Sequence, residues 1–168
     1  QWKFAATPDR APTIALAKDP ERQPRGSLQM SYKIEDDYGV TEARAQFAAR
    51  ANDASKNAAP PRPLFEAPQF PLVLPNARTR NGVGQTVKDL SEDPYAGADV
   101  TLTLTARDEA GNEGKSEPFN MRLPERLFTK PLARALIEQR RILALDANQN
   151  GQVWAAITSP RSPTQPIV

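Results

Sequence analysis

The chain has 168 residues, with 22 Lys and Arg against 20 Asp and Glu, and a net charge of +2 offers no clustered excess for binding nucleic acid. It contains no Cys and no His, which excludes disulfides, thiolate nucleophiles, zinc–thiolate and His-ligated metal sites, and a Ser-His-Asp triad. Its hydrophobic fraction of 39%, with only 7% aromatic residues, predicts one core built mainly from aliphatic side chains.

Extended segments dominate the first forty residues. Trp2 and Phe4 open one segment, and residues 13–17 form a second, because the surrounding prolines prevent a helix. In residues 27–34 apolar and polar side chains alternate, which is the period of a strand with one buried face. A tight turn over 35–39 follows, with its glycine at positive φ.

Residues 40–51 fit two predictions. Their composition of Ala, Glu, Gln and Arg favours a helix. Their alternation favours a strand, with three alanines and Phe47 on one face. We predict a strand paired with residues 27–34, because the turn over 35–39 would fold the chain back on itself.

The middle of the chain predicts a loop followed by short elements. Residues 52–68 are polar and rich in proline, and we expect a mobile loop. Residues 70–74 predict an edge strand, since an internal proline cannot donate to a ladder, and residues 84–90 predict another short strand. Residues 91–97 predict one helical turn capped by Ser91.

Residues 98–123 give the strongest signal of the sequence. Apolar residues alternate with threonines in the first part, glycines and carboxylates over 108–114 supply turn chemistry, and an extended run over 119–123 returns along the first. We expect a long antiparallel hairpin on which the rest of the chain packs. Leu104 is expected at the centre of the core and Thr103 in solvent.

After this hairpin the apolar period becomes helical. A helix is predicted over 129–145, capped by Thr129 and with Pro131 in its first turn. Two apolar lines run along it about 100° apart, and one line suffices to cover a sandwich face. We expect the helix, including Arg140 and Arg141, to bind a protein partner or a second copy, and Ile137→Asp to abolish self-association. The lines are Leu132, Leu136 and Leu143, and Ala133, Ile137 and Ala144.

Carboxylates near the two predicted turns are candidate Ca2+ ligands, because Ca2+ prefers oxygen donors. Asp36 and Asp37 lie in the first turn, and Asp108, Glu109 and Glu113 lie in the second. The alternative is that the aspartates bind backbone N–H groups of their own turns. Paired carboxylates also occur in glycosidases, but no aromatic platform accompanies these, and no enzyme is expected.

The loop after the predicted helix offers a second Ca2+ candidate. Residues 146–153 match the first eight positions of an EF-hand loop, with Asp146 at position one and Gly151 at position six. Position twelve is Ile157 where a bidentate Glu is required. The alternative is a polar loop that ends one helix, with residues 152–158 starting another. No cofactor is expected.

Four motifs, taken in order, resemble one family. ARDEAGN at 106–112 and DDYGV at 36–40 resemble motifs of bacterial immunoglobulin-like and fibronectin-type-III-like modules. Together with DPYAG at 93–97 and the stretch 123–141, which is the most specific, they resemble the large alphaproteobacterial membrane-anchored proteins of domain of unknown function 4175. The resemblance covers residues 1–158.

The resemblance implies a place in the cell rather than a mechanism. It implies a periplasmic part of an inner-membrane protein, attached through segments outside this chain, and it carries over no catalytic residues. We expect an immunoglobulin/fibronectin-III-like antiparallel β-sandwich over 1–124, a helical extension over 125–158 and a disordered tail over 159–168. The expected function is a non-catalytic spacer and protein-interaction module, with a Ca2+-binding structural or adhesive module as the alternative.

Overall fold

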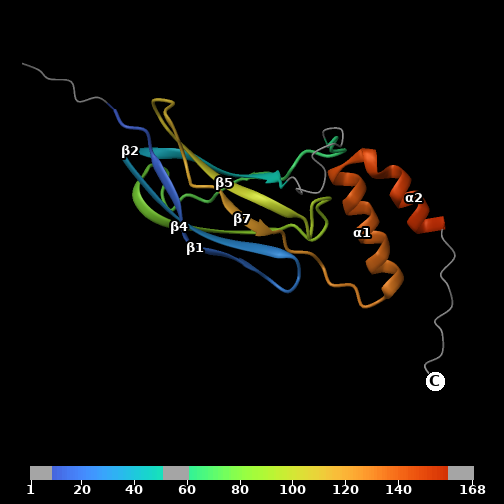
Figure 1. Ribbon diagram of the computed structural model, residues 1–168. Coiled ribbons are helices and arrows are strands. Elements are labelled where there is room, and N and C mark those ends of the chain that lie inside the picture. The colour runs from blue at the N-terminus through green and yellow to red at the C-terminus, as the bar shows by residue number, and fades with distance from the viewer. Residues whose placement is uncertain (1–8, 51–60, 159–168) are drawn as a thin grey trace, which may run out of the picture. The chain divides into compact units, whose positions relative to one another are not determined.

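The computed structural model describes residues 9–50 and 61–158. The chain forms two compact units, a β unit of residues 1–50 and 67–127 and a helical unit of residues 51–66 and 128–168 (Figure 1). The extended segment expected at Trp2 and Phe4, the tail 159–168 and most of the expected proline-rich loop lie outside the described residues.

The described part of the β unit is one antiparallel sheet, so the predicted mainly β architecture followed by helices is confirmed. Its seven strands are β1 (Thr13–Arg22), β2 (Ser27–Ala49), β3 (Gln69–Pro71), β4 (Thr79–Asp89), β5 (Asp99–Asp108), β6 (Glu113–Lys115) and β7 (Phe119–Arg122). The strand β2 has 23 residues and is the element with which four others pair.

The two halves of β2 have different neighbours. The first half lies between β1 and β4, and the second half lies between β3 and β5. A straight strand would hold Leu28 and Ala45 more than ~50 Å apart, at about 3.3 Å per residue. Lys88 pairs with Leu28 and Phe70 pairs with Ala45, yet the Lys88 amine lies 5.8 Å from the centre of the Phe70 ring. The strand β2 therefore turns back on itself, and its halves lie in two facing layers (Figure 1).

The turn in β2 is a corner over residues 36–39. The pairing of β2 with β4 skips there, from Glu35 opposite Asn81 to Val40 opposite Thr79. At the corner Gly39 has a φ of 110°, which favours glycine. The Asp36 carboxylate accepts hydrogen bonds from the backbone N–H groups of Tyr38, at 3.2 Å, and of Gly39. These bonds replace ladder bonds that the corner interrupts.

The structure at the corner confirms one prediction and shows that another is wrong. Residues 40–49 are strand and not helix, as alternation predicted. The predicted pairing of this strand with residues 27–34 is wrong, because the chain folds back across the core and pairs with β5 and β3. A chain that turns a corner between layers places the two halves face to face, so their side chains meet while their backbones bond to other strands.

The core lies between the two layers. The Tyr32 hydroxyl donates to the Val73 carbonyl and lies 2.7 Å from the Thr86 hydroxyl, so the buried phenol is hydrogen-bonded on both sides. Other fully buried side chains come from β2 and β5 and include Leu28, Met30, Ile34, Val40, Val100, Leu102 and Leu104.

The predicted hairpin is present, with a break in its returning strand. β6 and β7 both pair with β5, and residues 116–118 separate them. Across the break Ser116 stays bonded to Leu104, since its Oγ accepts the Leu104 N–H at 2.9 Å and its N–H donates to the Leu104 carbonyl at 2.8 Å. Leu104 is fully buried and Thr103 is partly exposed, as predicted.

Two predicted caps are wrong. Residues 91–97 form turns rather than a helical turn. Aspartates take the capping role predicted for Ser91, since Asp89 accepts the Ser91 N–H and Asp93 accepts the Tyr95 N–H. These aspartates satisfy the backbone locally, which removes the need for a helix. Thr129 caps no helix either, because the helix begins later, at Pro131, with Lys130 in the cap position and no side-chain cap bond.

The helical unit contains α1 (Pro131–Leu145), a 3-10 turn (Ala147–Gln149) and α2 (Asn150–Thr158). Both helices agree with the predictions for residues 129–145 and 152–158. The Ala144 carbonyl accepts the Leu64 N–H, so residues before the β unit resumes belong to the helical unit. Within the described residues, neither helix is long and apolar enough to cross a membrane.

The alternation of buried and more exposed side chains along β5 can be tested directly by substitution. Leu104→Ala removes a fully buried side chain and should lower the free energy of unfolding of the β unit by about 2–5 kcal/mol. Thr103→Ala, at the neighbouring position on the wet face, should cost less than about 1 kcal/mol. Denaturant unfolding of both variants measures the difference, and equal losses would show that the register of β5 is wrong.

Candidate functional site

The corner of β2 brings together aspartates from three parts of the chain. Asp36 and Asp37 lie in the corner itself, and Asp108 ends β5. Asp9 joins them from the start of the described chain and shares a side-chain hydrogen bond with Asp37. Asp9 was not predicted, because nothing local in the sequence shows that the residues before β1 pass this corner.

The charges of this acidic corner act on one another. Desolvation, the neighbouring charges of Asp37, Asp108 and Asp36, and the hydrogen bond with Asp37 raise the pKa of Asp9. The folded state therefore disfavours the ionised form of Asp9. Asn112 partly offsets the repulsion, because its side-chain amide donates to Asp9 at 2.9 Å and to Asp108 at 2.7 Å.

Asp108 is 3% exposed and supports the turn of the hairpin. Desolvation acts to raise its pKa, but hydrogen bonds outweigh it. These come from the Asn112 side chain, from its backbone N–H at 2.8 Å, and from the N–H groups of Gly111 and Ala110. The net result is a lowered pKa of Asp108, as expected for a carboxylate that accepts several donors.

One feature of the acidic corner suits a Ca2+ site, and several others do not. Asp36 Oδ2 and both oxygens of Asp108 already accept protein hydrogen bonds. Asp36 Oδ1 is buried and has no hydrogen-bond partner. Among the described residues no group of three acidic side chains has a geometry that holds a metal ion. Glu109 and Glu113 are bound elsewhere, in ion pairs with Arg78 at 2.8 Å and Lys115 at 3.5 Å.

The EF-hand-like loop uses its aspartate for structure. Asp146 accepts hydrogen bonds from the N–H groups of Arg62, at 3.1 Å, and Asn148, at 3.0 Å, and from the Gln149 amide at 3.2 Å. These bonds, that of Arg62 first, lower the pKa of Asp146. Position twelve of the motif, Ile157, lies on α2 and is 56% exposed. The loop ends α1 and connects it to α2.

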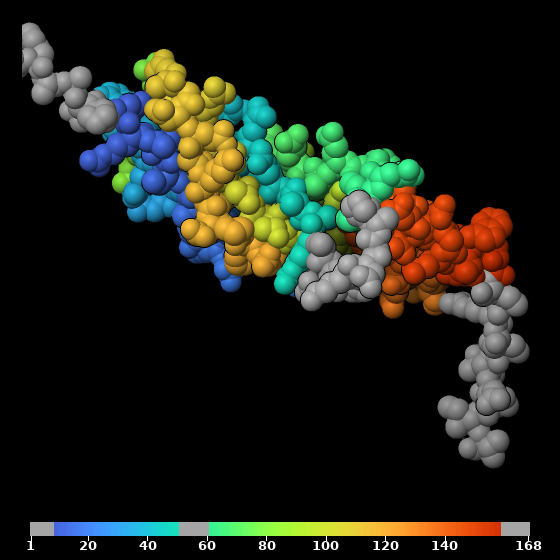
Figure 2. Space-filling view, turned by 45° about the horizontal axis from the view of Figure 1, so that its top comes forward, coloured from blue at the N-terminus to red at the C-terminus, as the bar shows by residue number. Residues whose placement is uncertain are grey.

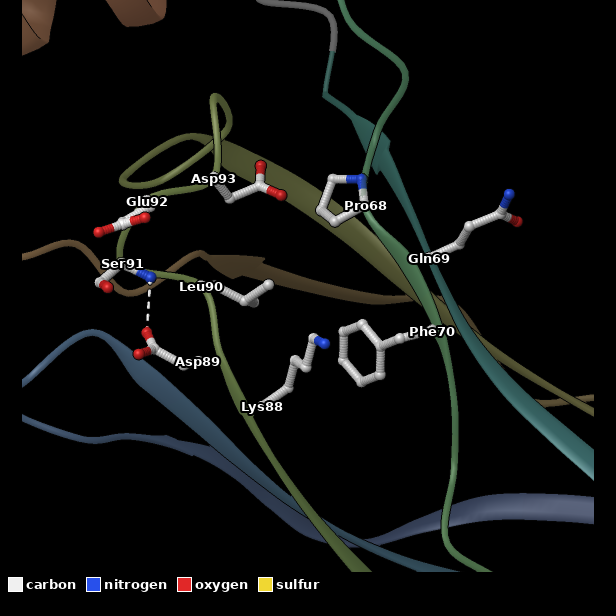
Figure 3. Close-up of a pocket in the computed structure, with 9 residues that line it drawn as sticks. All are labelled: Pro68, Gln69, Phe70, Lys88, Asp89, Leu90, Ser91, Glu92 and Asp93. Carbon is white, nitrogen blue, oxygen red and sulfur yellow. Dashed lines mark hydrogen bonds between the residues drawn. The ribbon is translucent and has the colours of Figure 1, made fainter.

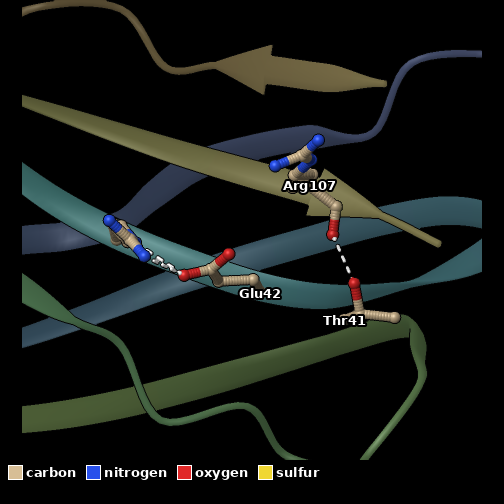
Figure 4. A network of polar contacts seen from close by, with 4 residues as sticks. Thr41, Glu42 and Arg107 are labelled. Carbon is tan, nitrogen blue, oxygen red and sulfur yellow. Dashed lines mark hydrogen bonds and ion pairs between the residues drawn. The ribbon is translucent and has the colours of Figure 1, made fainter. Parts of the chain in front are cut away.

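A polar face covers the outer side of the layer that contains β5. A shallow hollow of about 190 Å³ is lined there by charged residues of β2, β5 and β6. Glu42 pairs with Arg44 at 2.5 Å, and the Thr41 hydroxyl donates to the Arg107 carbonyl at 3.2 Å (Figure 4). Opposite charges alternate across this face, so it offers no uniform field to an anionic ligand.

A larger groove of about 330 Å³ opens between β3 and the end of β4. Phe70 and Leu90 supply its apolar lining, and Lys88 lies across the Phe70 ring (Figure 3). Ser91 and Asp89 meet at its rim, where the Ser91 N–H donates to Asp89 at 2.9 Å. Because the chain has no His, this pair lacks the usual base that would activate a serine.

The helical unit carries exposed apolar side chains on both helices, and of these the sequence assigned Leu132 and Leu136 to interaction. On α1, Leu132 is 66% exposed and Leu136 is 51% exposed. On α2, Trp154 is 70% exposed and its neighbour one turn on, Ile157, is 56% exposed. Figure 2 shows α2, in red, at the surface. We call these four residues the leucine–tryptophan surface.

The second apolar line of α1 is less exposed. Ala144 is 1% exposed and Ile137 is partly buried. Arg140 is exposed and Arg141 is partly exposed. Of the two lines that the sequence offered, the one with Leu132 and Leu136 is therefore the more exposed, although its third member, Leu143, is partly buried. Both lines are equally apolar in the sequence, so the sequence missed this distinction.

Comparison with known families gives one match. The family described as "Domain of unknown function (DUF4175)" matches residues 1–161. The search of curated proteins finds no match. The matched range includes the β unit, both helices and the acidic corner.

The lowered pKa of Asp108 predicts that the free energy of unfolding of the β unit falls at acid pH, and we call this fall the acid limb. As pH falls through the native pKa, below the unfolded value of about 3.9, the unfolded state binds the proton first and stability is lost. Asp108→Asn should lower stability at neutral pH and flatten this loss. Thr103→Asn, at a partly exposed position of the same strand, removes no carboxylate and should leave the acid limb unchanged. Denaturant unfolding from pH 2 to pH 7 measures all three proteins, and an equal acid limb in Asp108→Asn would contradict the assignment.

Proposed function

The chain belongs to the DUF4175 family, and from that premise we propose that it is a non-catalytic, extracytoplasmic spacer and protein-interaction module of a membrane-anchored envelope protein. The family description assigns no activity. The motifs at 36–40, 106–112 and 123–141 support the envelope setting through their resemblance to membrane-anchored proteins. The β unit supplies the rigid spacer, and the helical unit supplies the interaction surface.

The leucine–tryptophan surface carries the interaction part of this proposal. Leucines one turn apart on α1 are more than half exposed, and α2 exposes a tryptophan and an isoleucine. The nine residues of α2 include no charged side chain. Large apolar side chains exposed one turn apart on the same helix are the pattern by which helices bind apolar partners. Tryptophan is also among the residues that dominate binding energies.

An apolar helix face binds an apolar groove, and such a groove can be formed by the helices of a partner. Leu132 and Leu136 follow the i, i+4 spacing by which amphipathic helices enter grooves. We propose that the partner presents a helix, either from another protein or from a second copy of this chain. Arg140, which is exposed beside this surface, would contact acidic groups at its rim.

Leu136→Asp tests the proposal. In the wild type, raising the protein concentration should change the backbone chemical shifts and slow the amide exchange of residues around Leu136 and Trp154. Leu136→Asp should remove these changes, because a carboxylate in an apolar interface is costly to desolvate. Gln152→Asp, which adds the same charge at an exposed polar position, should keep them.

Helix content separates this result from unfolding. Leu136→Asp should retain the helical circular dichroism of the wild type, because Leu136 is exposed, whereas Ala144→Asp should lose it, because Ala144 is buried. Concentration-independent shifts at both Leu136 and Trp154 in the wild type, or unchanged shifts in Leu136→Asp, would refute binding of a second copy through this surface.

A Ca2+-binding structural or adhesive module is the second candidate function. The observation that favours it is the buried, unpartnered Asp36 Oδ1 beside Asp9, Asp37 and Asp108. Desolvation and repulsion together raise the pKa of Asp9, and a cation there would relieve the repulsion. The site requires some rearrangement, since Asp36 and Asp108 already accept backbone N–H groups.

A thermal melt in millimolar Ca2+ and in EDTA decides this candidate. Ca2+ at 100 times its dissociation constant should stabilise the β unit by about 2.7 kcal/mol. Asp37→Asn, which keeps the Asp36 turn intact, should reduce the shift, and Mg2+ should reproduce it poorly because it demands a tighter octahedral site. Identical melting curves in Ca2+ and EDTA would eliminate the candidate.

A further inference from the structure

The outer edge of β4 has backbone groups with no strand beside them. β4 pairs with β2 along its other edge. The Leu90 N–H donates to the Gly26 carbonyl, on the β2 side, and backbone direction alternates along a strand. The odd-numbered residues therefore point their N–H and C=O groups outward, and no strand among the described residues pairs with them. These residues are Asn81, Val83, Gln85, Val87 and Asp89.

The two edges of this layer differ in protection. At the opposite edge, β1 has two breaks in register and contains Lys18, Asp19 and Pro20, which all discourage another strand from pairing. In β4, residues 81–87 contain no charge and no proline, and their register with β2 has no break. An uncharged, regular edge of this length is a template for strand addition.

The side chains along the β4 edge are apolar at two positions. Val83 is 58% exposed and Val87 is 61% exposed, and both lie on the outer face of the layer with Gln85 between them. Exposed β-branched side chains on a strand gain most from a neighbour directly across from them. The edge thus offers both backbone hydrogen bonds and side-chain contacts.

We propose that β4 pairs antiparallel with β4 of a second copy, about a two-fold axis at Gln85. In this register Val83 of each copy faces Val87 of the other, and Asn81 faces Asp89. All five outward-pointing residues then exchange backbone hydrogen bonds. The layers of the two copies join into one sheet, in the order β1, β2, β4, β4, β2, β1.

Charge decides the register and favours a second copy as the occupant. Opposed residues in an antiparallel pair share a face, so the axis passes through one residue of β4. An axis at Gly84 would place Arg80 against Lys88, which are like charges. An axis at Thr86 would place Val83 against Asp89. Only the axis at Gln85 places both Val83 and Val87 opposite a valine while keeping like charges apart, so the edge is complementary to itself.

This inference goes beyond the proposed function because it uses the other unit and a different chemistry. The β4 edge binds through backbone groups, whereas the leucine–tryptophan surface binds through apolar side chains. A dimer through β4 presents two helical units to a partner. Two linked sites bind a partner with two matching sites more tightly than either does alone.

Charge variants of β4 test the pairing and its register. The experiments use the full chain carrying Leu136→Asp, so that association through the leucine–tryptophan surface does not contribute. Sedimentation velocity should then show a reversible dimer. Adding Val83→Lys with Val87→Lys places lysine against lysine across the axis and should weaken dimerisation at least ~10-fold. Val83→Glu with Val87→Lys places glutamate against lysine and should restore it.

The matched control introduces a charge on the other layer. Gln46→Lys, at an exposed position of β2 outside the β4 edge, should leave the dimer unchanged. A dimer that tolerates two lysines in β4, or one that the glutamate–lysine pair fails to restore, would overturn the proposal. Circular dichroism should show the same strand content in every variant, because Val83 and Val87 are exposed.

Amide hydrogen exchange gives a residue-by-residue test. The amides of Val83, Gln85 and Val87 should exchange more slowly as protein concentration rises, whereas those of Gly84 and Thr86, already bonded to β2, should not change. The same exchange rates at all concentrations, with a strict monomer in sedimentation, would overturn the proposal. That result leaves the proposed function standing, because the leucine–tryptophan surface is tested at Leu136 and Trp154.

Discussion

The corner of β2 is the constraint on which the β unit depends. The Asp36 carboxylate holds the N–H groups of Tyr38 and Gly39, and Gly39 takes a φ that other residues rarely adopt. A single strand can then supply the central position of both layers. Because β1, β3, β4 and β5 all pair with β2, the corner sets the register of the whole sheet.

The acidic corner follows from the same constraint. A carboxylate is needed at Asp36 to bind the backbone, and Asp108 is needed for the adjoining turn of the hairpin. Both turns lie beside Val40, which pairs with Thr79 on one side and Asp108 on the other. The folded chain therefore concentrates negative charge there, and Asn112 compensates part of it. Desolvation and this charge raise the pKa of Asp9. The hydrogen bonds that Asp36 and Asp108 accept in these two turns account for most of the cluster.

Sequence patterns predicted what depends on neighbours in the chain and failed where distant segments decide. The faces of Leu104 and Thr103 were predictable, because side chains alternate along any strand. The partners of residues 40–49 were not, because a turn and a corner between layers have the same local chemistry. For the proposed interaction surface, both apolar lines of α1 were visible, but the exposure of Leu132 and Leu136 and the burial of Ala144 depend on the tertiary structure.

The two surfaces that we propose for association differ in what a substitution can do to them. Binding by the leucine–tryptophan surface would depend on side chains, so we expect one carboxylate there to remove it. Pairing at the β4 edge depends on backbone groups that nearly every residue carries, and side chains only set its register and strength. The edge can therefore be retained while its sequence changes, provided that no proline or like-charge pair enters residues 81–87. A side-chain surface such as the leucine–tryptophan surface would change partner after a few substitutions, so of the two proposed contacts we expect the β4 edge to be the more durable.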